Sequence, residues 1–480
     1  MSRPRISLLS NTDIQQIHET SLHLLQRIGI RADHERALRL LADAGAQVDF
    51  SARTARLPER LVLEAVQQAG KAYTLFGRDV SKQTVLGQGK INMMSSHSQF
   101  AWTDPVTKER RYCTLADATR ATRLGDALSD IDLVGSMASP HELPARTRCL
   151  HLLNMMFGNT SKPISLWPHD AVTARYVIEM CKVVRGGLKG MQEYPLLEIF
   201  VEPISPLTFR PEGLDVLFAF AEIGHPVGFG PMVQSGATGP ATLAGAVAQE
   251  NAEILAAVVI AQLIHPGLPV SYWALPHLMD LSTMLISYGS PEQGLMGIAV
   301  SEMGRFYGIP VGTNTGLTDA KVPDAQAGLE KGMTLLMAAL SGSEIYGHMG
   351  IAGADQGASL AQLVIDNEMA RYVKRVAAGF AVNLETLAEE VIAQVGIGGN
   401  FLAEEHTVRH FRTEHWRPGR LWDRNDWDNW IGKGGKTMLD LALERQEELL
   451  ATHEPEPLPV GQAEDLARIV AEADRELLRG

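Results

Sequence analysis

Residues 291–348 decide the fold of this chain: PEQGLMGIAVSEMGRFYGIPVGTNTGLTDAKVPDAQAGLEKGMTLLMAALSGSEIYGH. Two long stretches with apolar residues at helical spacing alternate with two short apolar segments. We predict helices over Pro291–Tyr307 and Asp324–Leu340, and strands over Pro310–Asn314 and Glu344–His348. Because a helix separates the two strands, they should lie parallel in one sheet, joined by a crossover.

The same alternation extends towards the amino terminus and once more beyond residue 348. In total we predict eight strand-then-helix units. The predicted strands are Ile91–His97, Ile131–Ala138, Pro163–Trp167, Leu196–Glu202, Val227–Met232, Val270–Ala274, Pro310–Asn314 and Glu344–His348. The helices that follow them are Leu115–Leu128, Pro144–Phe157, Ala171–Val184, Pro211–Ile223, Pro240–Ile264, Pro291–Tyr307, Asp324–Leu340 and Leu360–Ala377.

Eight such units predict an α/β protein with a (β/α)8 TIM barrel. A doubly wound open sheet is the alternative, but it would usually carry a glycine-rich phosphate turn after its first strand, and MMSSHSQF (93–100) contains no glycine. We expect three parts: an N-terminal helical extension over residues 1–90, the barrel over 91–380, and a C-terminal helical layer over 381–480 that packs on the barrel. The extension should hold helices over Asp13–Ile28, Asp33–Ala44 and Pro58–Ala69.

The composition is that of an ordinary globular enzyme. Hydrophobic residues make up 45% of the 480 residues, and the net charge is −13 without a basic stretch, which argues against nucleic acid as the main partner. The three cysteines are far apart, so they predict neither a disulfide framework nor a thiolate metal site. The first residues lack the apolar core of a secretion signal, and the longest apolar run, near 254–264, is short for a bilayer span. We therefore expect a cytoplasmic protein.

The aromatic and charged tail holds one candidate metal motif. His406 and His410 are four residues apart, with Glu404, Glu405 and His415 nearby, so one helix face could present two imidazoles and a carboxylate to zinc. The alternative is an amphipathic helix whose histidines and arginines pair with acidic neighbours. Because no further ligand is apparent and the segment lies outside the strands, we expect no metal site.

Aromatic side chains gather at the predicted carboxyl ends of the strands, where barrel enzymes place their chemistry. This mouth is poor in lysine and arginine. It suits a cation with diffuse charge, such as a quaternary ammonium, held by the negative faces of the rings. The alternative is that the rings only pack the top of the barrel. The aromatic residues at these ends include Phe100, Trp102, Trp167, Phe200, Tyr272, Trp273 and Tyr346.

Several segments resemble the trimethylamine methyltransferase superfamily, and the resemblance covers nearly the whole chain. They are LLQRIGI (24–30), ALRLLADAGAQVDF (37–50), GATGPATLAGAVAQENAEILAAVVIAQLIHPGLPV (236–270), GSPEQGLMGIAVSEMGRFYGIPV (289–311), LTDAKVPDAQAGLEKGMTLLMAALSG (317–342), QLVIDNEMARYVKR (362–375) and FLAEEHTVRHFRTEHWRP (401–418). The resemblance implies a (β/α)8 barrel that passes a methyl group from an amine to the cobalt of a partner corrinoid protein.

The founding branch of that family carries pyrrolysine, which we would place near Asn314–Leu317. This sequence consists of standard residues, so it resembles the branch without pyrrolysine, whose members demethylate quaternary amines. The resemblance thus implies transfer from a quaternary amine, first glycine betaine, to the Co(I) corrinoid of a partner. No cofactor is expected to be tightly bound, because the partner supplies the cobalamin. Proline betaine, carnitine and γ-butyrobetaine are alternative substrates, and we expect a homo-oligomer without a membrane or nucleic-acid partner.

Roles can be assigned to the residues at the strand ends. Trp102, Trp167, Trp273 and Tyr346 are expected to surround the cation, with Phe100 and Tyr272 in reserve because the phase of strand alternation is open. The candidates for the substrate carboxylate are His97, Asn314 and His348, and Glu202 either faces the ammonium or pairs with a neighbour. The candidates for contact with the corrinoid are Gly312, Gly316, Gly347, Gly350 and Asp319.

Two other functions fit the same fold. An aldolase or decarboxylase would need a Schiff-base lysine at a strand end, whereas Lys162 and Lys321 lie before or beyond strands. A non-catalytic barrel that binds quaternary ammonium compounds would share the aromatic mouth but would transfer no methyl group to reduced cobalamin.

Overall fold

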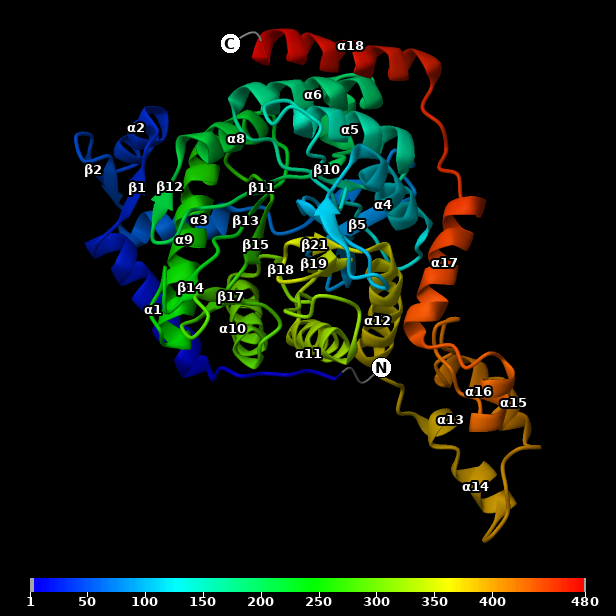
Figure 1. The fold of residues 1–480 in the computed structure, drawn as a ribbon. Helices are drawn as coiled ribbons and strands as arrows, with labels where there is room; N and C mark the ends of the chain where they lie inside the picture. Colours follow the sequence, from blue (N-terminus) through cyan, green and yellow to red (C-terminus); the bar gives the residue numbers. More distant parts are fainter. Residues whose placement is uncertain (1–3, 479–480) are drawn as a thin grey trace.

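The computed structural model describes residues 4–478. Helices surround a curved sheet of parallel strands, and part of the carboxyl-terminal region extends away from this body (Figure 1). The predicted α/β alternation is confirmed.

Six strands form one parallel sheet in the order β11-β13-β15-β18-β19-β6, a half-barrel. Their bounds are β6 (Asn92–Ser95), β11 (Phe200–Val201), β13 (Val227–Phe229), β15 (Val270–Ala274), β18 (Val311–Thr313) and β19 (Ile345–Met349). Most residues of these strands are buried, in agreement with the short apolar segments in the sequence.

Further parallel pairings continue from both edges of the half-barrel. β9 (Ile164–Ser165) pairs with β10 (Leu197–Glu198), which directly precedes β11 in the chain. Single parallel bridges join Met94 to Leu133 and Val134 to Ile164. The predicted strand Ile131–Ala138 is thus reduced to bridges. The backbone at Gly135 comes close to the end of β6, where a Cβ atom would lie 2.3 Å from the Ser96 carbonyl oxygen.

Nine helices from α4 to α12 follow these strands and cover the outside of the sheet. Consecutive long helices contact one another, and α12 contacts α4 in turn. The helices are α4 (Leu115–Ala127), α5 (Arg148–Asn159), α6 (Ala171–Arg185), α7 (Leu188–Glu193), α8 (Pro211–Ala221), α9 (Leu243–Ile264), α10 (Pro291–Tyr307), α11 (Ala325–Ser341) and α12 (Leu360–Ala378). All eight predicted helices are present, although α5 begins at Arg148 and α9 at Leu243, later than the predicted starts at Pro144 and Pro240.

Helix α9 is central to the packing. Among the described residues it is the one helix long and apolar enough to cross a membrane, yet 78% of its apolar window is buried inside the fold. It contacts α1, α3 and α10 as well as β15. It also carries buried polar groups: Glu250 accepts a hydrogen bond from the Leu275 backbone N–H at 2.6 Å, and Glu253 accepts one from that of Leu207 at 2.8 Å. These contacts are those of a core helix.

Short strands beyond the carboxyl ends of the parallel strands build a rim. One rim sheet has the order β20-β21-β7-β8 and the other β14-β16-β17. Their bounds are β7 (Ala101–Thr103), β8 (Arg110–Tyr112), β20 (Ile351–Ala352), β21 (Gly357–Ala358), β14 (Gln234–Ser235), β16 (His277–Asp280) and β17 (Leu285–Ser287). Each rim segment follows a strand of the half-barrel in the chain, so the loops that carry the site are themselves structured.

The N-terminal region contains the three predicted helices and two small sheets. α1 and α3 pack on α9, and a capping box between Ser10 and Asp13 starts α1. Gly29 ends this first helical segment with φ +82°, where a Cβ atom would lie 2.2 Å from the Ala55 carbonyl oxygen. The elements are α1 (Asn11–Arg27), β1 (Ile30–Ala32), α2 (Glu35–Asp43), β2 (Gln47–Asp49), β3 (Thr54–Arg56), α3 (Glu59–Gln68), β4 (Tyr73–Phe76), β5 (Gln83–Leu86) and, completing the first sheet, β12 (Thr208–Phe209).

The C-terminal region divides into two parts. α17 (Met438–Thr452) packs on α12 and α4, and α18 (Val460–Leu477) packs on α6 and α5, as a helical layer should. The four helices before them project from the body instead (Figure 1), and none of their residues is buried. They are α13 (Leu384–Leu387), α14 (Glu389–Val395), α15 (Glu405–Glu414) and α16 (Trp427–Gly432).

Candidate active site

A cavity opens at the carboxyl ends of the parallel strands, between the two rim sheets. The empty space within it, counted together with the open solvent at its mouth, is about 500 Å³. Its walls contain three aromatic rings, three carboxyl groups and three imidazoles, and none of its lining residues is lysine or arginine. The lining residues are Met94, His97, Trp167, Glu198, Phe200, Glu202, Met232, Trp273, Leu275, His277, Asn314, Leu317, His348 and Asp355.

The aromatic rings of Trp167, Phe200 and Trp273 form one continuous wall. Trp167 stacks on Phe200 with a centroid distance of 5.5 Å and an interplanar angle of 17°. Phe200 meets Trp273 edge-on, at 5.8 Å and 84°. The wall therefore offers both ring faces and ring edges to a molecule in the cavity.

Small residues on the neighbouring strands make room for these rings. A Cβ atom on Gly312 of β18 would lie 2.4 Å from Trp273 Cδ2, and one on Gly228 of β13 would lie 2.5 Å from Trp273 Cδ1. A Cβ atom on Gly230 would lie 2.5 Å from Phe200 Cε2. The indole of Trp273 thus lies flat across its two neighbouring strands because both of them lack side chains there.

Three carboxyl groups face the same space. Burial raises the pKa of Glu198 to about 7, although Ser165 Oγ donates a hydrogen bond to its Oε2 at 3.1 Å. Burial and the nearby Asp355 raise the pKa of Glu202 to about 7. Burial likewise raises the pKa of Asp355 to about 7, against a hydrogen bond of 2.9 Å from Gln99 Nε2. Each group would ionise more readily once a cation occupies the cavity.

The imidazoles are neutral near pH 7. Burial lowers the pKa of His97 and of His277 to about 4, and burial together with the other two imidazoles lowers the pKa of His348. Asn314 Nδ2 lies 2.9 Å from His277 Nε2. His348 has a φ of +73° at a register shift in β19, a strained conformation of the kind found at functional sites.

Four shielded polar atoms of the lining residues have no hydrogen-bond partner among the described residues. They are Trp167 Nε1, Trp273 Nε1, His348 Nδ1 and Glu198 Oε1. Such atoms are rare in folded proteins and call for an explanation, such as a bound molecule. The two indole N–H groups are donors only, so an anionic or carbonyl oxygen would satisfy them.

Six of the predicted site residues lie together in this cavity: His97, Trp167, Glu202, Trp273, Asn314 and His348. Four predicted aromatic residues do not line it. Tyr272 and Tyr346 point to the helix side, where their hydroxyls bond to Asn251 Oδ1 at 2.9 Å and to the Ser343 carbonyl. Trp102 borders a separate polar hollow and Phe100 is 46% exposed. Strand alternation explains the position of Tyr272, because adjacent residues of a strand face opposite sides and Trp273 takes the inward one.

The glycines expected to contact a corrinoid are buried instead. Gly312 and Gly347 lie under Trp273, while Gly316 and Gly350 have φ values of +88° and +91° and abut the side chains of neighbouring residues. Asp319 braces the rim by accepting hydrogen bonds from Tyr288 N at 3.1 Å and Ser287 Oγ at 3.2 Å. The four glycines therefore serve packing and turns, whereas Asp319 is partly exposed and its expected contact with the corrinoid stays a prediction.

Glu198 and Asp355 are the acidic residues of the site that sequence reasoning missed. Glu198, Phe200 and Glu202 alternate along one chain segment, so the period of two that places Glu202 in the cavity also places Glu198 there. Asp355 lies in the turn between β20 and β21, and nothing in the local sequence marks it. Only the return of this turn over the cavity brings it to the other two acids.

Comparisons with known proteins fit this geometry. A family model described as trimethylamine methyltransferase (MTTB) matches residues 1–477. The chain belongs to the trimethylamine methyltransferase family. It is 34% identical over 467 residues to trimethylamine methyltransferase MttB of Desulfitobacterium hafniense strain DSM 10664 / DCB-2, covering 97% of this chain and 94% of that protein. It is 31% identical over 477 residues to glycine betaine methyltransferase of D. hafniense strain Y51, covering 99% and 98%.

Solved structures support the fold of this methyltransferase. The monomethylamine methyltransferase (MtmB) of Methanosarcina barkeri matches with a TM-score of 0.52 at 12% identity, over 93% of this chain and 95% of that one. The hydroxylamine complex of MtmB matches over the same shares with a TM-score of 0.53. At this identity the likeness concerns the fold alone. Family membership makes the chain a methyltransferase, and the resemblance seen in the sequence segments is confirmed.

Proposed function

We propose that this methyltransferase takes a methyl group from a quaternary amine, first glycine betaine, and passes it to the Co(I) corrinoid of a partner protein. The observation that carries the proposal is the cavity itself, in which Trp167, Phe200 and Trp273 face three carboxyl groups without a lysine or arginine in the lining. Aromatic faces attract a methylated ammonium at about 0.5–2 kcal/mol per contact, and the carboxyl groups add attraction when ionised.

Glycine betaine also carries a carboxylate, for which the cavity has matching donors. The indole N–H groups of Trp167 and Trp273 are unpaired among the described residues, as is His348 Nδ1. Hydrogen bonds to a carboxylate are charge-assisted and therefore strong. Asn314, held by His277 at 2.9 Å, is a further neutral donor at the same wall. The relative named glycine betaine methyltransferase supports testing this substrate first.

The chemistry asks the protein mainly for positioning. Breaking a carbon–nitrogen bond of a quaternary ammonium releases a neutral tertiary amine, so no general acid is needed. The Co(I) corrinoid supplies the nucleophile that accepts the methyl group. The residues of the cavity hold the cation in a dry space with one methyl group towards the mouth. Since the positive charge on nitrogen fades in the transition state, carboxyl groups that are only partly ionised near pH 7 avoid trapping the ground state.

We also propose that the strands close into a complete (β/α)8 barrel. The parallel pairings of β9 with β10 and the bridges at Met94–Leu133 and Val134–Ile164 support closure between β6 and β11. The contact of α12 with α4 supports it in the outer layer. In a closed barrel the cavity would lie at the carboxyl-terminal mouth, the place of chemistry in barrel enzymes.

The corrinoid protein is proposed to dock at the rim beside the cavity. The hairpin β16–β17 starts at the cavity wall with His277 and exposes Leu281, Met284 and Leu285 at or near its tip, each more than 60% exposed. Exposed apolar groups of this kind are typical of interaction sites. A homo-oligomer is a second proposed assembly, supported by exposed apolar side chains on the projecting region, among them Leu384 and Leu402.

One assay tests the proposed function. The purified protein is mixed with cob(I)alamin and, in separate reactions, glycine betaine, proline betaine, carnitine, γ-butyrobetaine and trimethylamine, and the cobalt spectrum is followed for methylcobalamin. Methylation with glycine betaine but not with trimethylamine is the expected result. Activity with another betaine alone would correct the substrate. Tight binding of a betaine without methylation would favour a non-catalytic binding protein. The Schiff-base alternative has lost its support, since no lysine lines the cavity.

A further inference from the structure

The projecting region between α12 and α17 lacks a core of its own. It spans residues 379–437 and contains α13 to α16, in which no residue is buried. Its apolar side chains are largely exposed, for example Leu384 at 89% and Leu402 at 85%, and the buried exception is Leu421, outside the four helices, which is 3% exposed and packs on the main core. A short segment that buries so little surface usually needs a disulfide, a metal ion or an association to stay ordered.

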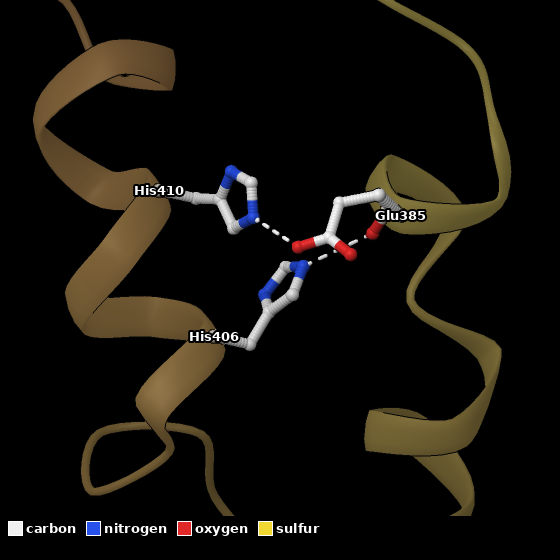
Figure 2. A group of neighbouring side chains, drawn as sticks. All are labelled: Glu385, His406 and His410. Atoms are coloured by element: carbon white, nitrogen blue, oxygen red, sulfur yellow. Dashed lines mark hydrogen bonds and ion pairs between the residues drawn. The ribbon is translucent and has the colours of Figure 1, made fainter.

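One side-chain cluster joins two of these helices. Glu385 on α13 faces His406 and His410 on α15, and the two histidines stand one helical turn apart and point towards it (Figure 2). His410 Nε2 is 3.0 Å from Glu385 Oε1, and His406 Nε2 is 3.2 Å from the Glu385 backbone carbonyl. One ligand atom from each of the three residues lies within 4.8 Å of the other two.

These groups are the donor set that zinc-class metals prefer. Two imidazoles and one carboxylate supply three ligands, at metal–ligand distances of about 2.0–2.2 Å, and leave a fourth position for water. The rings of His406 and His410 are 4.3 Å apart between centroids, so small side-chain rotations bring all three donors to one point. Glu385 lies 21 residues before His406 and 25 residues before His410. The local motif around the two histidines therefore did not reveal this carboxylate.

The competing contact is an ion pair. Arg409 NH1 lies 3.2 Å from Glu385 Oε1, the oxygen that also faces His410. Among the described residues no hydrogen bond reaches Glu385 Oε2. The carboxylate can therefore bind a metal through Oε2 while Arg409 keeps its contact with Oε1.

We propose that Glu385, His406 and His410 form a binding site for a divalent zinc-class metal ion, which ties α13 to α15 and orders the projecting region. The site is separate from the cavity at the strand ends and does not depend on the function proposed for it. Its ligands come from two helices that otherwise share no buried contact, so the metal would take the place of the missing core.

The test uses the full chain, stripped with a chelator, and Zn²⁺ or Co²⁺ alone as the probe. Titration calorimetry at pH 7.5 should detect one site per chain, and Co²⁺ should give the absorption of a metal with imidazole ligands. Even the loss of an outer-shell partner typically costs about 10–100-fold in metal affinity, so His406→Ala, His410→Ala and Glu385→Gln should each weaken binding by at least that much. His415→Ala and Glu405→Gln, on or directly after the same helix, are the matched controls.

A second readout tests the structural role. Zn²⁺ should slow tryptic cleavage within residues 379–437 severalfold in the unmodified chain and in the two controls, but not in the three ligand variants. His406→Gln replaces His406→Ala if the latter fails to fold. The proposal is overturned if the unmodified chain binds no metal, if binding survives in the ligand variants, or if bound Zn²⁺ leaves the cleavage rate unchanged.

Discussion

Replacing Glu198 with glutamine separates the effect of this buried carboxyl group on stability from its effect on the binding of the amine. Glu198 is 3% exposed, receives one hydrogen bond from Ser165, and has a second oxygen without a partner among the described residues. Burial raises its pKa from the ordinary 4.5 to about 7. The folded protein therefore holds this proton more tightly than the unfolded chain, so the carboxyl group lowers the free energy of unfolding increasingly between pH 4.5 and pH 7, and the loss levels off above pH 7.

The size of the effect follows from that pKa. A carboxyl group with this pKa difference between the folded and unfolded states destabilises the fold by about 1 kcal/mol at pH 5 and by about 3 kcal/mol at pH 8. Glutamine has nearly the same shape and never ionises. The advantage of Glu198→Gln in unfolding free energy should therefore grow by about 2 kcal/mol between the two pH values. For a chain of this length that is a change in Tm of about 2 °C.

The assay is a thermal unfolding scan of both proteins at pH 5, 6, 7 and 8, with a titration of glycine betaine at each pH. The Tm difference should widen with pH, while the affinity for the amine should fall in the variant at pH 8 and match the unmodified protein at pH 5, where Glu198 is protonated. Glu64→Gln, at an exposed position, is the control. A Tm difference that stays constant from pH 5 to pH 8 would refute the reasoning.

Three further changes test the packing of the site. Trp273→Phe keeps an aromatic ring but loses the indole face and its N–H, so the affinity for a quaternary amine should fall roughly fivefold with little change in Tm. Gly312→Ala should lower the Tm and shift the tryptophan fluorescence, because its Cβ atom would lie 2.4 Å from the indole. We expect it to lower the free energy of unfolding by about 1–3 kcal/mol. The control Gly332→Ala, with open space around it, should instead raise that free energy by up to about 1 kcal/mol. Lys331→Met leaves the buried Asp366 without its ion pair of 3.1 Å and should lower the free energy of unfolding by about 3–5 kcal/mol. Adding Asp366→Asn in the same chain should restore part of that loss in the unfolding scan. Tm values unchanged by Gly312→Ala or Lys331→Met would contradict these contacts.

The sequence alone determined the order of elements and the family. Apolar periodicity is a local property, so it located the helices of the N-terminal region and the alternating strands and helices of the sheet, apart from the predicted strand Ile131–Ala138, which is reduced to bridges. It also brought six site residues to the correct end of the sheet, since the carboxyl ends of parallel strands share one edge. The family followed from whole segments, whose combined match is more specific than any single residue.

The tertiary structure decided which side chains meet. The phase of each short strand selected Trp273 and rejected Tyr272, and the neighbouring glycines fixed how the indole lies. Asp355 joined the cavity, and Glu385 joined His406 and His410, through loops that local periodicity does not describe. Burial, which sets the pKa of Glu198 near 7, depends on every segment packed around the carboxyl group. Side-chain contacts and the burial of a charged group both depend on segments that are far apart in the sequence. They are therefore defined only when the chain is folded.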